Sequence, residues 1–492
     1  MLFNSLEFLL FFPIVSLLFF GLPHRMRWLL LLVASCYFYM FFVPVYILIL
    51  AGTIVIDYFA GIWIENAAPK NKKLLLSLSI IANVGVLAVF KYYNFINQNI
   101  TDLLGNFQLS NPIPYLEILL PIGLSFHTFQ AMSYTIEVYR GNQKAERHFG
   151  IYALYVMFYP QLVAGPIERP QNVLHQFHEK KYFNYDKAVS GLKLMAWGMF
   201  KKVVIADRLS LFVNQVYDQP HLYEGISLVV ATVFFTFQIY CDFSGYSDIA
   251  IGSARVMGFE LMTNFKRPYL SQNIAEFWSR WHISLSTWFR DYLYIPLGGN
   301  RVSVNRRYLN LFIVFMISGL WHGANWTFVF WGFLHSIYLI TGIISKPLQE
   351  KIALRTGLIN YPMLHKFIHQ SWVFILAALA WIFFRVTSMS DGFYIVSNLG
   401  SNLFQSTLDV LSNTNFARLK YLYLNQSQLD FMLAIAGIVF LMLFDRLDEQ
   451  KSIWESFKQK NTILKWSFYF FLIYFTLFFG VFEKAQFIYF QF

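Results

Sequence analysis

Two histidines in apolar stretches of the chain are the residues whose surroundings best suit chemistry. His322 lies in Gly319-Leu-Trp-His-Gly-Ala-Asn-Trp326, about 14 residues or about 21 Å beyond the predicted helix start at Tyr308. A neutral imidazole titrates near physiological pH and can act there as a general base. Gly319 and Gly323 flank His322 at helical spacing and would let another chain or a ligand approach. The alternative is a core histidine that is hydrogen-bonded between helices.

The second histidine, His282, belongs to a segment at 277–299 that is too polar for a helix facing lipid. This composition predicts the wall of an aqueous tunnel, in which Arg280 and Arg290 would meet phosphates near the cytoplasmic side. The alternative is that Arg290 and Asp291 only satisfy structural charges. With neighbouring motifs included, the predicted substrate-binding residues are Asp242, Arg280, Ser284, Ser286, Arg290, Asp291 and Asn325.

A third polar cluster occupies the apolar segment FQIYCDFSGYSDIAIG at 237–252, with Asp242 and Asp248 inside it. Its alternative is a hydrogen-bonded polar core between helices. The sequence contains no phosphate-binding loop, no GxSxG elbow and no HExxH motif. The histidines lack the spacing of metal ligands, so we expect no metal site.

The composition restricts the class of protein. Of 492 residues, 57% are hydrophobic, 20% are aromatic and only 13% are charged, whereas a soluble domain has roughly 25% charged residues. This excludes a soluble globular domain, a disordered chain and a disulfide-stabilised secreted scaffold. The net charge is +11, but the basic residues lie between apolar runs. They therefore indicate membrane orientation rather than nucleic-acid binding.

Uncharged runs long enough to span a bilayer recur along the whole chain. The first, Phe8 to His24, is interpreted as a retained span because it lacks a basic n-region and a cleavage site. Pro44 divides the run Trp28–Ile56 into two helices, and Tyr308–Ser345 is long enough for a helical hairpin. Less clean segments, expected to be re-entrant in part, lie near 115–137, 149–165, 191–215 and 276–297.

The basic loops set the orientation. Alternate loops are rich and poor in Lys and Arg, which predicts about 12 crossings with both termini outside the cytoplasm. The Asn- and Ser-rich segment 386–429 is then an outer loop. We expect a single all-α integral membrane domain over residues 1–492, with an extracytoplasmic tail at 483–492.

At these polar segments the chain resembles the membrane-bound O-acyltransferase superfamily. More narrowly, it resembles the bacterial branch of alginate and peptidoglycan O-acetyltransferase membrane subunits and the teichoic acid D-alanyl transfer protein. The resemblance covers essentially the whole chain. Its most specific segments are FWSRWHISLSTWFRDYLYIPLGGNR and GLWHGANWTFVFWG; further ones are MLFNSLEFLLFFP, PIGLSFHTFQAMSYTIEVYRG, YPQLVAGPIERP and FQIYCDFSGYSDIAIG.

The resemblance implies a ring of helices around a thin floor that is pierced by a tunnel. It implies that His322 is catalytic and that His282 supports it within that tunnel. A donor thioester enters from the cytoplasm, and the basic inner face suits acetyl-CoA as a substrate, with no bound cofactor. The implied partners are an extracytoplasmic SGNH-type acetyltransferase and a polysaccharide of the alginate type or peptidoglycan. The implied location is the bacterial inner membrane.

The end of the chain, Phe487-Ile-Tyr-Phe-Gln-Phe492, resembles the FxYxxF-like motif of the small partner peptide in the teichoic acid system. The resemblance makes Tyr489 a candidate acyl relay. The alternative is an aromatic tail at the lipid interface.

Two other classes of function remain open at this stage. A polysaccharide or lipid transporter would also use polar residues in a cavity, although no internal repeat of the kind common in transporters is visible. A non-catalytic membrane scaffold is the other class, but both histidines stand in their motifs, which disfavours it. Within the acyltransferases, D-alanyl transfer to teichoic acid is the alternative to O-acetylation.

Overall fold

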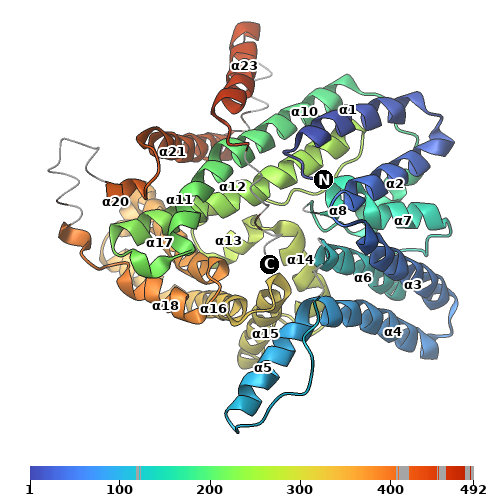
Figure 1. Cartoon of the computed structure of the whole chain (residues 1–492), viewed down its shortest axis with the longest axis horizontal. Helices are drawn as coiled ribbons and strands as arrows, with labels where there is room; N and C mark the ends of the chain where they lie inside the picture. The colour runs from blue at the N-terminus through green and yellow to red at the C-terminus, as the bar shows by residue number, and fades with distance from the viewer. Residues whose placement is uncertain are drawn as a thin grey trace. The chain divides into compact units, whose positions relative to one another are not determined.

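The computed structural model describes residues 1–117, 121, 123–163, 165–405, 408, 420–451, 453, 461–482 and 488. Within these residues all regular secondary structure is helical (Figure 1). The chain packs as two compact units, and the single membrane domain stays a prediction. Met1–Gly198 with Tyr246–Thr263 forms the first, and Met199–Gly245 with Asn264–Phe492 forms the second.

The first unit contains most of the N-terminal half of the chain. Its longer helices are α1 (Leu6–Gly21), α2 (His24–Met40), α3 (Ile47–Asn66), α4 (Pro69–Leu87), α5 (Tyr93–Gly105), α6 (Leu124–Arg140), α7 (Phe149–Met157), α9 (Pro170–His178), nearly all of α10 (Tyr185–Met199) and the end of α12 (Ile226–Val256). Buried polar groups join its helices: Asp57 of α3 accepts hydrogen bonds from Ser79 and Asn83 of α4 at 2.6 and 2.9 Å.

The second unit contains the predicted chemistry. Its elements are the π-helix η3 (Phe200–Ala206), α11 (Asp207–Tyr217), the first part of α12, α13 (Ile274–Arg280), α14 (Ile283–Phe289), the π-helix η6 (Arg290–Tyr294), α15 (Val304–His322), α16 (Trp326–Arg355), α17 (Pro362–Arg385), α18 (Met389–Asn398), α20 (Lys420–Tyr423), α21 (Gln428–Gln450) and α23 (Thr462–Phe479). π-Helical turns disturb the regular hydrogen-bond ladder and are frequent near functional sites.

Two breaks that the sequence predicts are present. Pro44 opens a short 3-10 turn, Pro44–Tyr46, between α2 and α3, because proline lacks the N–H that a continuous helix needs. The long apolar run after Tyr308 forms the hairpin of α15 and α16, and Asn325 caps the start of α16 by accepting from the Thr327 N–H at 3.0 Å. Both expectations are confirmed.

Seven described helices are long and apolar enough to cross a membrane: Pro44–Asn66, Pro69–Gly105, Ile226–Val256, Trp326–Arg355, Pro362–Arg385, Gln428–Gln450 and Thr462–Phe479. The all-helical, multi-pass class is therefore confirmed. Several other predicted crossings fall in shorter helices, so the count of about 12 and the ring around a tunnel stay predictions. The expected outer loop 386–429 contains α18, and its residues 406–407 and 409–419 lie outside the described part.

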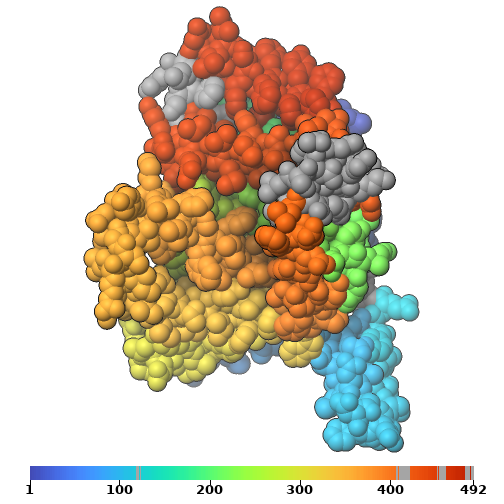
Figure 2. Space-filling model, turned by 90° about the vertical axis from the view of Figure 1, so that its left-hand side faces the viewer, coloured from blue at the N-terminus to red at the C-terminus, as the bar shows by residue number. Residues whose placement is uncertain are grey.

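Helix α21 illustrates why the solvent must be lipid. Ala434, Ile438 and Leu441 are buried against the protein. On its other side Met432 and Val439 are 60% and 49% exposed. Figure 2 shows α21 and α23 in red, above the orange helices α17 and α18 of the same unit. Apolar side chains on both sides of a helix are stable only where one side faces lipid.

Two glycines allow α15 and α16 to touch along their backbones. A β-carbon on Gly319 would lie 2.3 Å from the carbonyl oxygen of Phe328, and one on Gly332 would lie 2.3 Å from that of Phe315. The expected role of Gly319 as a site of close approach is confirmed, and the approaching chain is α16. The Gly323 position is equally tight, because its β-carbon would meet the Phe328 ring at 2.2 Å.

We predict that Gly319→Ala and Gly332→Ala each destabilise the protein by about 1–3 kcal/mol, because the new methyl groups overlap backbone atoms that cannot move independently. Gly342→Ala is the matched control, since nothing lies within 4 Å of its β-carbon on the same helix α16. Thermal unfolding in detergent measures the difference. Equal melting temperatures for the three variants would contradict the close-approach interpretation.

Candidate active site

His282 is fixed by a small polar cluster in the second unit. The side chain is fully buried, and its Nδ1 lies 3.1 Å from Oδ1 of Asn264. The same oxygen accepts from the backbone N–H and the hydroxyl of Ser284, at 3.2 and 2.9 Å. A carbonyl oxygen only accepts hydrogen bonds, so Nδ1 carries the proton in this arrangement and Nε2 carries the lone pair.

The backbone of His282 is as constrained as its ring. Its φ and ψ are 41° and 55°, in the left-handed region, where it precedes α14. A non-glycine residue there costs about 1–2 kcal/mol, and such residues cluster at functional sites. The Ile283 N–H donates to the Asn264 carbonyl at 2.9 Å and holds this turn in place.

His322 is the last residue of α15 and lies among aromatic rings. It is 5% exposed. Its ring centroid lies 4.9 Å from that of Trp321, 4.9 Å from that of Trp331 and 5.1 Å from that of Phe384. All three contacts are edge-to-face. These rings exclude water from much of the imidazole.

The structure brings the two predicted histidines into one aromatic cluster. Trp321 contacts both, with its ring centroid 6.3 Å from His282 and 4.9 Å from His322. Phe243 of α12 packs edge-on against His282 at 4.6 Å. Residues of the segments at 237–245, 277–299 and 319–326 therefore meet within the second unit.

Asp242 is a member of a buried charge cluster next to these rings. Its side chain pairs with Lys202 of η3 at 2.6 Å, and Lys202 also pairs with Asp207 at 2.7 Å. All three side chains are at most 3% exposed. The neighbouring Lys201 donates to Ser244 at 2.8 Å. The sequence-based alternative of a polar core between helices thus describes the immediate partners of Asp242.

Arg280 is occupied by carboxylates rather than turned to an open channel. It donates to Glu276 at 2.7 Å and to Glu449 at 2.9 and 3.1 Å. Burial lowers the pKa of Arg280, but the hydrogen bonds and charges of Glu449 and Glu276 together outweigh burial, so the pKa lies above its usual value. Arg267 pairs with the same Glu449 at 2.8 Å. A phosphate would have to compete with these pairs.

The remaining predicted residues lie in several settings. Arg290 and Asp291 pair at 2.8 Å, with side chains 59% and 30% exposed. Ser286 donates to the Trp281 carbonyl at 3.2 Å, and Asn325 donates to the Thr387 carbonyl at 2.9 Å while capping α16. Ser284 shares the Asn264 oxygen with His282. Tyr489 lies outside the described residues.

Sequence reasoning missed several buried residues around the histidines and Asp242. Asn264 gives no signal, because a single asparagine in a loop is ordinary. Lys201 and Lys202 are adjacent lysines, which usually mark a solvated loop, yet both are buried. His335, also fully buried, accepts from the indole N–H of Trp278 at 3.3 Å and lies 4.8 Å from the Trp331 ring. Trp331 thus separates His335 from His322.

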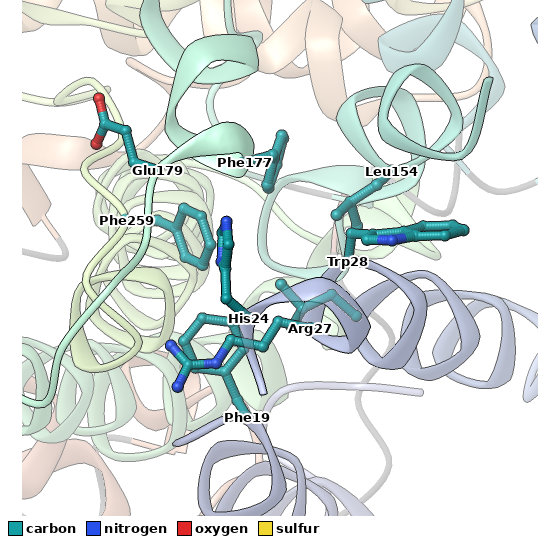
Figure 3. A pocket seen from close by; sticks show the side chains of 9 residues that line it. Phe19, His24, Arg27, Trp28, Leu154, Phe177, Glu179 and Phe259 are labelled. Carbon is teal, nitrogen blue, oxygen red and sulfur yellow. The ribbon is translucent and has the colours of Figure 1, made fainter. Parts of the chain in front are cut away.

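A pocket in the first unit contains none of the predicted site residues (Figure 3). It is lined by Phe19, His24, Arg27, Trp28, Leu31, Leu154, Phe177, Glu179 and Phe259. The Arg27 guanidinium donates to the carbonyls of Phe20, Leu22 and Lys181, so its charge holds the local backbone together. Among the described residues, no group of three or more His, Cys, Asp or Glu side chains is arranged to hold a metal ion.

Comparison with known proteins adds a family and relatives. The model of the membrane-bound O-acyltransferase family matches residues 16–386. A Pseudomonas aeruginosa protein named "Probable alginate O-acetylase" is 39% identical over 79% of this chain and 73% of its own. A Helicobacter pylori peptidoglycan O-acetyltransferase is 37% identical over 76% and 73%. A Streptococcus thermophilus teichoic acid D-alanyltransferase is more distant, at 32% identity over 44% and 56%.

We predict that Asn264→Ala destabilises the protein by about 1–3 kcal/mol, because the donors of His282 and Ser284 lose a shared buried acceptor. Asn264→Asp keeps an acceptor oxygen and should retain more stability. Asn360→Ala, at an exposed position, is the control. Thermal unfolding of the three purified variants tests this ordering, and an Asn264→Ala protein as stable as the control would refute it.

Proposed function

The chain belongs to the membrane-bound O-acyltransferase family, and we propose that it passes an acetyl group from cytoplasmic acetyl-CoA to an extracytoplasmic polysaccharide. That it is a multi-pass membrane O-acyltransferase follows from the family match and the apolar helices. The choice of acetyl follows from relatives named as alginate and peptidoglycan O-acetyltransferases, which cover more of the chain than the D-alanyltransferases. The observation that carries the proposal is the pair of buried histidines joined by Trp321.

In the proposed reaction, His322 acts as the general base. An imidazole nitrogen accepts the proton of an acceptor hydroxyl, and the hydroxyl oxygen attacks the thioester carbonyl carbon. The carbon–sulfur bond then breaks, and the leaving thiolate of CoA takes the proton from His322. The surrounding rings of Trp321, Trp331 and Phe384 support this role, because they exclude water from the place of proton transfer.

His282 has a supporting role in this scheme. With its Nδ1 proton engaged by Asn264, its Nε2 can accept a hydrogen bond but cannot donate one to a carbonyl oxygen. This favours positioning of the donor over polarisation of the thioester. Ser284, held by the same asparagine, would extend the polar wall.

The acyl group has to leave the enzyme on the outer side. A bulky polysaccharide cannot enter a narrow tunnel, so a two-step transfer through Tyr489 to an extracytoplasmic SGNH-type acetyltransferase would solve the access problem. In this model both termini lie outside the cytoplasm of a bacterial inner membrane. Ile488, the residue before Tyr489 in the sequence, is only 2% exposed, which supports the relay over the interfacial alternative.

Replacement of the proposed base gives the first functional test. His322→Ala should lower release of free CoA from acetyl-CoA by at least about a hundredfold, the usual contribution of a general base. His221→Ala, at a side chain 59% exposed in the same unit, should leave it unchanged. A monodisperse His322→Ala protein that retains wild-type release would exclude the assignment. A transporter or scaffold would release no CoA even before mutation.

The relay is tested separately by Tyr489→Phe, which deletes a single oxygen. We expect acetylation of the polysaccharide in cells to be lost, while the protein reaches the membrane in normal amounts. Mass spectrometry of the purified wild-type protein incubated with acetyl-CoA should find the C-terminal peptide heavier by one acetyl group. Wild-type polysaccharide acetylation in the Tyr489→Phe strain would rule out the relay.

A further inference from the structure

Two buried carboxylates share one ammonium in the second unit. Lys202 lies between Asp207 and Asp242, at 2.7 and 2.6 Å, in an almost fully buried site. A buried carboxyl group is costly unless further hydrogen-bond donors reach it. A donor that reaches the second oxygen of Asp242 therefore stabilises this cluster.

That donor comes from the far end of the chain. The backbone N–H of Ile488 donates to the second carboxylate oxygen of Asp242 at 2.8 Å, and Ile488 is 2% exposed. The first oxygen of Asp242 faces Lys202. Asp242 thus uses its two oxygens for two purposes, one toward the ammonium and the other toward the C-terminal segment.

The same region of the protein also holds the chain before it reaches Ile488. The Val481 N–H donates to the carbonyl of Val203 in η3 at 2.8 Å. Arg208, the residue after Asp207, donates to the carbonyl of Phe479. Phe479, Val481 and Ile488 are therefore each bound by η3, α11 or α12, the elements that contain Lys202, Asp207 and Asp242.

We propose that the Lys202–Asp242 pair is the anchor of the C-terminal segment, in which Asp242 binds the backbone amide of Ile488, the residue that precedes Tyr489 in the sequence. Asp242 is a positioning residue in this proposal. Its functional meaning rests on the proposed relay at Tyr489, whereas the anchor itself rests on the contacts of Asp242 and Ile488. Phe243, the neighbour of Asp242, touches His282 at 4.6 Å, so the anchor adjoins the proposed site.

Charge explains why an ion pair suits this task. One oxygen of Asp242 pairs with Lys202 at 2.6 Å, and charge-assisted hydrogen bonds are roughly twice as strong as those between neutral groups. The bond to Ile488 is made to backbone, so it does not depend on the side chain at 488. A neutral residue at 242 would bind the amide more weakly and would remove one of the two carboxylates that pair with Lys202.

A labelling experiment tests the anchor directly. In a Cys36→Ser, Cys241→Ala background, Ile488→Cys keeps the N–H and reports on access of a polar maleimide to purified protein in detergent. We expect labelling at least tenfold slower than at an exposed Lys351→Cys control. Asp242→Ala should raise the rate at 488 at least tenfold, and Asp242→Asn, which keeps an acceptor oxygen, should raise it less. Fast labelling at 488 with Asp242 intact, or no change in Asp242→Ala, would overturn the proposal.

A second variant covers the case in which Asp242→Ala does not fold. Ile488→Pro removes the donor and leaves the buried charges in place, while Ile488→Val keeps the donor. Trypsin cleavage after Lys484, followed by intact mass, should be at least tenfold faster in Ile488→Pro than in Ile488→Val. Equal rates would overturn the anchor.

The anchor and the proposed function fail in different ways. His322→Ala should leave labelling and cleavage unchanged while CoA release is lost. If CoA release survives His322→Ala but the segment stays protected, the chemistry is wrong and the anchor stands. If Ile488→Pro frees the segment and polysaccharide acetylation continues, the anchor stands and the relay at Tyr489 is wrong.

Discussion

The constraint on which the rest of the structure depends is the pairing of buried charge in a protein whose solvent is lipid. Lys202 lies between Asp207 and Asp242, and around this pair η3, α11 and α12 are held at a fixed spacing. Breaking a buried pair is more costly than never forming it, so these elements cannot shift independently. Because Phe243 of α12 rests on His282, the ion pair also fixes one wall of the histidine cluster.

Aromatic packing and close backbone contacts also hold the helices of the second unit together. Gly319 and Gly332 bring α15 against α16, and this places His322 and Trp331 on facing helices with their rings 4.9 Å apart. Trp321 then connects the hairpin to His282. The high aromatic content thus has two uses, since rings fill this cluster as well as facing lipid.

The sequence predicted the class of fold, the break at Pro44, the hairpin after Tyr308 and the family. Apolar runs and proline act locally, so composition and spacing are enough to find them. It also named His282, His322, Ser284 and Asp242, which meet in one unit. The sequence analysis did not identify Asn264, Lys202 or Asp207, because their partners come together only in the folded chain. Arg290 and Asp291 show the opposite case. The sequence predicted that they bind substrate, and in the structure they pair with each other, with side chains 59% and 30% exposed.

The left-handed backbone of His282 has a consequence for how a substrate meets the site. The Asn264 contacts hold His282 at φ 41° and ψ 55°. Its backbone therefore cannot adopt another conformation without breaking these contacts. The ring therefore acts as a fixed template, and adjustment on binding falls to the substrate. In the reaction proposed above, conformational adjustment therefore falls to the donor, whose pantetheine chain is flexible along its length.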